Sequence, residues 1–118
     1  MLLMTALLFA GVAFAGTIQN DLQKKKADYY ATEAVKYFKL EESQKATIYE
    51  AKVNWIQAQL KMAQMVKNGE LAAEDEKSYR KENLYPFSQK IMNELGVKWK
   101  ELVKFNKTVH PVMNKLRM

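Results

Sequence analysis

One stretch, residues 42–67, reads ESQKATIYEAKVNWIQAQLKMAQMVK and determines the fold class. It contains no Gly or Pro, and its apolar residues recur at steps of four and three, the spacing of one helix face. The main apolar seam consists of Tyr49, Val53, Ile56, Leu60 and Ala63, with a second line beside it at Ile48, Trp55 and Met62. Such a helix measures about 40 Å, which is long for a small domain and predicts an elongated or paired shape.

The segments on either side are also helical in pattern. Residues 19–39 are expected to form a helix with Asn20 as its candidate N-cap. The apolar residues of this segment fall on one face, namely Ala27, Tyr30, Ala31, Ala34, Tyr37 and Phe38. After residue 67, the pair Asn68-Gly69 predicts a helix stop, because Gly readily adopts the left-handed conformation of a helix C-terminus.

A third helix is expected from about Leu71. Three acidic residues lie near its start, where the positive end of the helix dipole stabilises negative charge: Glu74, Asp75 and Glu76. Its apolar seam continues through Pro86, which removes a backbone donor and disfavours helix at the preceding residue. We therefore expect a kink or a break at Pro86, and an end at Gly96.

A last helix, from about Val97 to Thr108, should end before Pro111, followed by a loose tail over residues 112–118. Together these patterns predict an all-α fold. We expect about four helices with a long central helical hairpin, elongated or cradle-like in shape. Residues 16–118 should form one domain, because neither repeats nor linkers divide them.

The first residues have the character of an export signal. Residues 2–15 carry no charge, and Ala13 and Ala15 precede Gly16 in the small-x-small pattern that signal peptidases accept. The run is shorter than the roughly 20 residues that cross a bilayer as a helix. We expect a signal peptide over residues 1–15 and a periplasmic location in a Gram-negative cell. A buried N-terminal helix and a retained anchor are the alternatives.

Composition excludes several classes of protein. With 48% hydrophobic and 27% charged residues, the chain is not intrinsically disordered as a whole. The absence of Cys excludes disulfide frameworks and thiolate zinc sites. A net charge of +6 with six Tyr could suit nucleic acid, but export and the lack of a binding motif argue against it. Basic and aromatic residues also suit an anionic membrane surface or acidic segments of unfolded proteins.

Catalytic chemistry has few candidates in this sequence. His110 is the single histidine and lies beside Pro111, so a Ser-His-Asp triad is not expected. Acidic pairs fall at helix starts, where the helix dipole explains them. We find neither a Gly-rich phosphate loop nor a His/Cys cluster with zinc spacing. Of the seven Met, Met1 and Met4 belong to the expected signal peptide, and the others are expected to fill the core or an adaptable surface. We therefore predict no catalytic residue, no metal and no cofactor.

Residues 38–44, FKLEESQ, followed by Ile48-Tyr49, resemble the L-T-x-x-Q box of the Spy/CpxP family. Leu40 and Gln44 keep the separation of the box, whereas Glu41 replaces its Thr. In this box the Thr caps a helix, the Gln completes a capping box, and the Leu packs inward. The resemblance implies a small periplasmic helical protein linked to envelope stress. It also implies a homodimer in which two hairpin-like chains form a thin cradle, and, for Spy-type members, ATP-independent chaperone activity.

The expected function is therefore that of an exported chaperone-like protein or envelope-stress adaptor. It would bind unfolded or partner polypeptides through a basic, aromatic-lined surface, with these candidate client-binding residues: Tyr30, Tyr37, Lys24, Lys25, Lys26, Trp55 and Met62. Two alternatives stay open at this point. One is a periplasmic metal-sensing or enzyme-inhibiting module that uses His110, Met and carboxylates; the other is a helical protein of the membrane surface.

Overall fold

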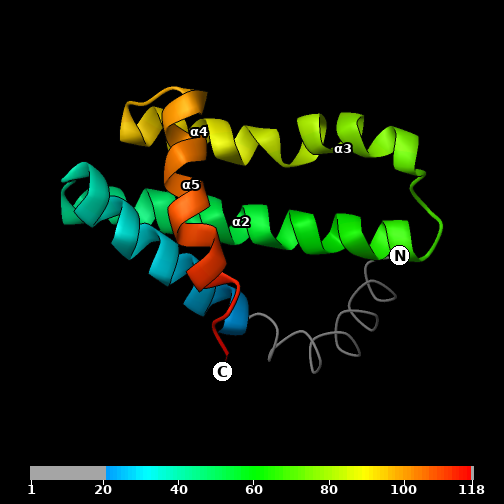
Figure 1. Ribbon diagram of the computed structural model, residues 1–118, viewed down its shortest axis with the longest axis horizontal. Helices are drawn as coiled ribbons and strands as arrows, with labels where there is room; N and C mark the ends of the chain where they lie inside the picture. The colour runs from blue at the N-terminus through cyan, green and yellow to red at the C-terminus, as the bar shows by residue number, and fades with distance from the viewer. Residues whose placement is uncertain (1–20, 118) are drawn as a thin grey trace, which may run out of the picture.

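The computed structural model describes residues 21–117, and these residues form an all-α fold (Figure 1). The helical segments are residues 21–38, α2 (Glu42–Lys67), the 3-10 turn η1 (Ala73–Asp75), α3 (Glu76–Asn83), α4 (Tyr85–Leu95) and α5 (Trp99–Met113). The predicted all-α class is confirmed, and no strand occurs in the described part of the chain. The principal extents are 45 × 32 × 28 Å, which agrees with the predicted elongated shape.

Helix α2 has the bounds that the sequence predicts. At its start, the Glu41 backbone N–H donates to the Gln44 side-chain oxygen at 3.0 Å. This hydrogen bond matters because backbone N–H groups at the start of a helix have no carbonyl partner within the helix. At its end, Gly69 is left-handed with φ of 76°, and the Glu70 N–H donates to the Met65 carbonyl at 2.8 Å. This bond belongs to a Schellman motif, which explains why the chain turns back at this point.

The return arm of the hairpin consists of α3 and α4, which run antiparallel to α2 (Figure 1). The expected break is confirmed, because Leu84 separates the two helices and Pro86 lies in the first turn of α4. There its missing N–H belongs to a position without an intrahelical partner, so the proline costs little. The expected start near Leu71 is wrong: the α-helix begins at Glu76, after η1.

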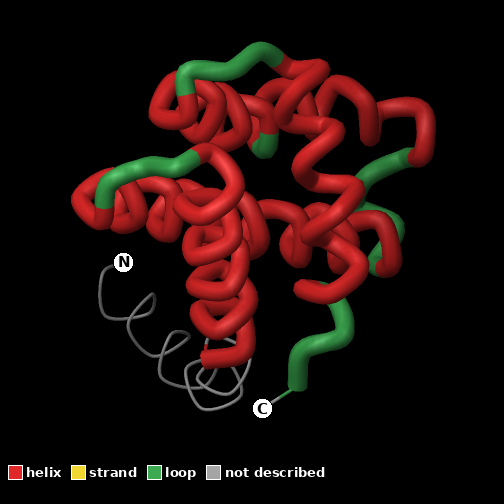
Figure 2. The backbone as a smooth tube through the Cα atoms, turned by 60° about the vertical axis from the view of Figure 1, so that its left-hand side comes forward, coloured by secondary structure: helices red, strands yellow, loops and turns green. Residues whose placement is uncertain are grey.

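Helix α5 crosses the hairpin and packs against residues 21–38 (Figures 1 and 2). The Phe105 ring lies 5.3 Å from the Tyr30 ring and 5.2 Å from the Phe38 ring, measured between centroids. The expected end before Pro111 is wrong, because α5 continues to Met113. Val109 and Met113 are both buried, and their burial offsets the one hydrogen bond that the proline removes.

The C-terminal tail is more ordered than the sequence predicts. Residues 112 and 113 belong to α5, and Met113 is part of the core. The Lys25 ammonium donates a hydrogen bond to the Arg117 carbonyl, which ties the chain end to the first described helix. The prediction of a loose tail is therefore wrong for Val112 and Met113, which belong to α5.

The core confirms one predicted apolar face and shifts another. In residues 21–38 the predicted face is buried at Ala27, Tyr30, Ala31 and Ala34, whereas Tyr37 remains 51% exposed. In α2 the predicted main seam is wrong toward its end, because Leu60 is 45% exposed and Ala63 is exposed as well. The buried residues of α2 are Ile48, Ala51, Lys52, Ile56 and Met62.

Two sequence predictions lie outside the described residues, namely the signal peptide over residues 1–15 and the Asn20 cap. Within residues 21–117, no helix has the length and apolar character that crossing a membrane requires.

Candidate functional site: a basic, aromatic cleft

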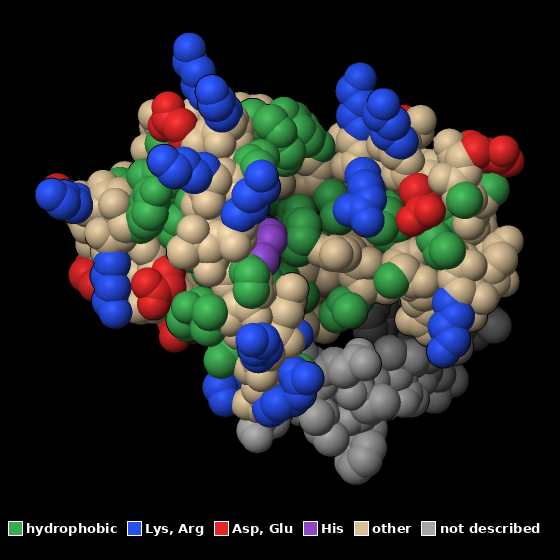
Figure 3. Space-filling model, in the orientation of Figure 1, with side chains coloured by type: hydrophobic (Ala, Val, Ile, Leu, Met, Phe, Trp, Pro, Cys, Tyr) green, Lys and Arg blue, Asp and Glu red, His purple; other side chains and the backbone are tan. Residues whose placement is uncertain are grey.

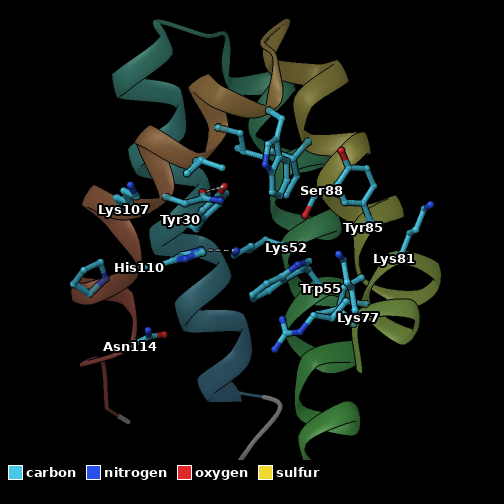
Figure 4. Close-up of a pocket in the computed structure, with 18 residues that line it drawn as sticks. Tyr30, Lys52, Trp55, Lys77, Lys81, Tyr85, Ser88, Lys107, His110 and Asn114 are labelled. Atoms are coloured by element: carbon cyan, nitrogen blue, oxygen red, sulfur yellow. Dashed lines mark hydrogen bonds between the residues drawn. The ribbon is translucent and has the colours of Figure 1, made fainter. Parts of the chain in front are cut away.

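A cleft of about 980 Å³ opens between α2, the α3–α4 arm and α5 (Figure 4). It forms because α4 packs closely on α2 while α5 crosses above them, so that side chains from all these helices face a common space. In the space-filling view, His110 lies in a hollow with apolar atoms beside it and Lys and Arg side chains around it (Figure 3). The volume is in the range of pockets that hold a small organic molecule or a short peptide segment.

The lining combines aromatic rings with positive charge. Four aromatic residues contribute, namely Tyr30, Trp55, Tyr85 and Trp99. Five basic residues contribute as well, namely Lys52, Lys77, Arg80, Lys81 and Lys107. No Asp or Glu is among the described residues that line the cleft. The cleft is therefore suited to a ligand that presents both apolar surface and negative charge.

Lys52 lies at the inner end of the cleft, where α2 faces α5. It is only 2% exposed, and its Nζ atom lies 2.9 Å from His110 Nε2. The same Nζ atom lies 4.1 Å from the centroid of the Tyr30 ring and 3.9 Å from that of Trp55. Three rings therefore surround the amine, and Figure 4 shows Lys52 pointing toward His110 beside Trp55.

This environment changes the pKa of both members of the pair. Burial lowers the pKa of Lys52 to about 7, because the charged ammonium loses its hydration. Burial and then the positive charge of Lys52 lower the pKa of His110 to about 4. His110 is consequently neutral at pH 7, and its Nε2 atom accepts the hydrogen bond whenever Lys52 is protonated.

Tyr30 forms one wall of this inner end and is held in place from two sides. Its hydroxyl donates to the Asn106 side-chain oxygen at 2.6 Å, and its ring contacts Phe105 edge-on. Burial raises the pKa of Tyr30, so the hydroxyl stays neutral and remains a donor. The position of the ring under the Lys52 amine is therefore fixed by packing and by a hydrogen bond.

The outer part of the cleft is more exposed and more basic. Trp99 is 47% exposed and its ring lies 5.3 Å from that of Tyr85, so the two form an aromatic lip. On the α3–α4 arm, next to Tyr85 in the chain, α3 contributes Lys77, Arg80 and Lys81. Figure 4 shows Lys77, Lys81 and Tyr85 on the same side of the cleft.

The structure brings only two of the predicted client-binding residues into the cleft. Tyr30 and Trp55 line it together, but Tyr30 does so as a buried residue. Met62 is buried farther along α2 and does not line the cleft. Outside the cleft, on the first described helix, lie Tyr37, Lys24, Lys25 and Lys26.

The central pair of the cleft, Lys52 and His110, was not predicted from the sequence. One signal for Lys52 was available, because it lies four residues after Ile48 and four before Ile56, on a face that is otherwise apolar. A lysine at such a position is buried with its ammonium among other side chains, which is rare without a partner. No comparable signal marks His110, since its role depends on contact with a residue 58 positions away.

The residues of the predicted family motif have a structural role beside the cleft. The Gln44 side chain accepts from the Glu41 N–H and also donates from Nε2 to the Glu94 carbonyl at 3.2 Å. It thus joins the start of α2 to the end of α4, at the end of the hairpin that lies away from the turn after α2. Leu40 packs against the core, as the capping-box interpretation predicts.

Comparison with known proteins yields no relative for this chain. No protein family, no curated protein and no solved structure matches it. The resemblance to the Spy/CpxP box therefore stays a prediction that rests on Leu40 and Gln44. Among residues 21–117, no group of three or more His, Cys, Asp or Glu side chains is placed to hold a metal ion.

Proposed function

We propose that this chain is an exported, chaperone-like or adaptor protein that binds acidic, apolar segments of unfolded or partner polypeptides without a nucleotide. One observation carries the proposal: the open cleft combines aromatic rings and basic side chains, with no acidic residue among the described lining residues. Exposed hydrophobic side chains at the mouth of a cleft are typical of interaction sites rather than of a sealed core.

The cleft suits a polypeptide segment for two physical reasons. The exposed rings of Tyr85 and Trp99 offer apolar contact to many side-chain shapes. The basic side chains of α3 attract negative charge at a distance, which raises the association rate and makes binding sensitive to salt. Contacts of this kind are adaptable and individually weak, as a protein that binds many unfolded clients requires.

The test is suppression of aggregation, followed by light scattering, with two clients of opposite charge. Reduced α-lactalbumin is acidic and reduced lysozyme is basic, and we expect protection of the acidic client only. In Trp99→Ser the protection should fall several-fold, because the aromatic lip loses its larger ring. Leu60→Ser is the matched control, because Leu60 is 45% exposed, close to the 47% of Trp99, but lies outside the cleft.

Two results would contradict the proposal. One is equal protection of the acidic and the basic client, and the other is equal loss of activity in Trp99→Ser and Leu60→Ser. Circular dichroism of both variants verifies that each retains its helices, so that a loss of activity reports on the cleft.

Two further parts of the proposal concern the whole protein. Cleavage after Ala15 and a periplasmic location stay predictions, which mass spectrometry of the N-terminus of the exported protein tests. The homodimer that the Spy/CpxP resemblance implies also stays a prediction. Sedimentation equilibrium should give twice the mass of one chain, and a monomer at all concentrations would contradict it.

A further inference from the structure

We propose that the inner end of the cleft is a subsite for one carboxylate, and that Lys52 supplies its counter-charge. The inference deepens the proposed function and rests on it for the identity of the ligand. The group that we assign to the subsite is the side-chain carboxylate of an Asp or Glu flanked by apolar residues in the bound segment.

The first argument is the missing counter-ion of Lys52. All 13 Asp and Glu residues of the chain lie within the described range, and an ion pair is formed by Lys45 with Asp28, on the surface. Lys52 has no acidic partner among residues 21–117, although it is almost completely buried. Native proteins pair nearly all buried charges, because an unpaired buried charge is costly. A ligand carboxylate would provide the partner that the chain itself omits.

The second argument is the direction of the amine. Lys52 lines the cleft rather than an enclosed cavity, and Figure 4 shows its side chain between His110 and Trp55, facing the space between α2 and α5. The His110 Nε2 atom accepts a hydrogen bond from one N–H of the ammonium, which leaves two N–H groups for other acceptors. The Tyr30 and Trp55 ring faces stabilise the cation but cannot neutralise it.

The third argument concerns which anion fits. Beside the rings that surround Lys52, the cleft has buried apolar lining residues, namely Leu84, Ile91 and Leu102. A single buried amine matches the single charge of a carboxylate, whereas a phosphate dianion needs several donors. The remaining basic residues lie farther out, at Lys77, Arg80, Lys81 and Lys107, where they attract the ligand. The site is therefore built for a carboxylate attached to an apolar body.

Binding to this subsite is linked to protons. The titratable groups that face the amine are His110 from α5 and Tyr30 from the first described helix. Both are neutral near pH 7, since burial lowers the pKa of His110 to about 4 and raises that of Tyr30. Lys52, whose pKa is lowered to about 7, is then the group that changes charge between pH 6 and pH 9. A carboxylate binds its protonated form, so affinity falls as the pH rises above 7.

The experiment titrates the exported protein with 4-phenylbutyrate and with its neutral amide, by calorimetry. At pH 6 we expect the acid to bind about tenfold more tightly than the amide, and this preference should disappear by pH 9. In Lys52→Met the preference should be lost at both pH values. Lys24→Met is the control, because it removes the same charge from an exposed position outside the cleft, and it should retain the preference.

Three results would overturn the proposed subsite. The first is equal affinity of the acid and the amide at pH 6, and the second is an affinity of the acid that does not change from pH 6 to pH 9. The third is an unchanged preference for the acid in Lys52→Met. If Lys52→Met fails to fold, the pH profile of the unmodified protein still decides the matter.

Peptides separate this inference from the proposed function. Two peptides blocked at both ends carry Phe beside either Glu or Gln, and a third carries Gln with a free C-terminus. We expect the Glu peptide to bind best, with the same dependence on Lys52. If both blocked peptides bind equally and the small acid shows no preference, the subsite fails, and the proposed function then depends on protection of the acidic client over the basic one in the aggregation assay. If the small acid shows the preference and no peptide binds, the proposed function fails. Stronger binding of the free C-terminus would overturn the assignment to a side chain.

Discussion

At the scale of single residues, we expect Lys52 to dominate the pH dependence of stability above pH 7. Its pKa is lowered to about 7 in the folded state by burial, whereas a lysine of an unfolded chain titrates near 10.4. Between these values the unfolded state binds more protons than the folded state, so the free energy of unfolding rises with pH. Below pH 7 the folded protein carries the full cost of a buried ammonium.

The first prediction follows from this linkage. From pH 7 to pH 9 the free energy of unfolding should rise by up to about 1.4 kcal/mol per pH unit. Lys52→Met should remove this increase and should raise the stability at pH 6, since Met fills the same space without a charge. Urea denaturation at a series of pH values measures both effects. Equal slopes in the unmodified protein and in Lys52→Met would show that Lys52 is not the group responsible.

The second prediction concerns His110. Its pKa is lowered to about 4 by burial and by the charge of Lys52, so stability should also be lost as the pH falls from 6.5 toward 4. In Lys52→Met the pKa of His110 should rise, because the positive neighbour is gone. The chain has a single histidine, so one set of imidazole NMR signals reports the titration directly. A midpoint near 6.5 in the unmodified protein would contradict the buried pair.

At the scale of elements, helix ends determine where the chain turns. Gly69 and Gly96 take the left-handed conformation at two of these ends, with φ of 76° and 69°. Lys39 does the same after the first described helix, with φ of 54°, and the Leu40 N–H donates to the Val35 carbonyl as in a Schellman motif. A side chain at such a position is strained, whereas glycine is not.

The third prediction uses this strain. Lys39→Gly should raise the free energy of unfolding by about 1 kcal/mol. Gly96→Ala, its counterpart, should lower it by a similar amount, although its new methyl group would meet no atom within 4 Å. Chemical denaturation of both variants measures the changes. A loss of stability in Lys39→Gly would mean that the lysine side chain contributes more than its backbone strain costs.

Elements with local signals were predictable from the sequence. The bounds of α2 follow from an unbroken periodicity that ends at Asn68-Gly69, and the break at Leu84 follows from Pro86. The end of α5 was not predictable, because the burial of Met113 by distant residues outweighs the local effect of Pro111. Leu60 was misplaced for the same reason: periodicity gives an apolar face, but only packing partners determine which part of the face is covered.

At the scale of the whole molecule, the cleft is a product of topology. Residues far apart in the sequence meet in it, and the contact of Lys52 with His110 spans 58 positions. The sequence could predict that Tyr30 and Trp55 lie on apolar helix faces and are candidates for binding, since both stand in apolar periodic patterns. It could not predict that α5 would cross the hairpin and place His110 between them, because that arrangement depends on tertiary packing.

The central claim is that this cleft binds acidic, apolar polypeptide segments. Its most direct test is NMR chemical-shift mapping on the protein during titration with the blocked Phe-Glu peptide. We predict that the largest changes occur at the indole signals of Trp55 and Trp99 and at the imidazole of His110, and that 4-phenylbutyrate reverses them. Changes centred instead on Leu60 and Lys67, at the exposed end of α2, or no change at saturating peptide, would contradict the account.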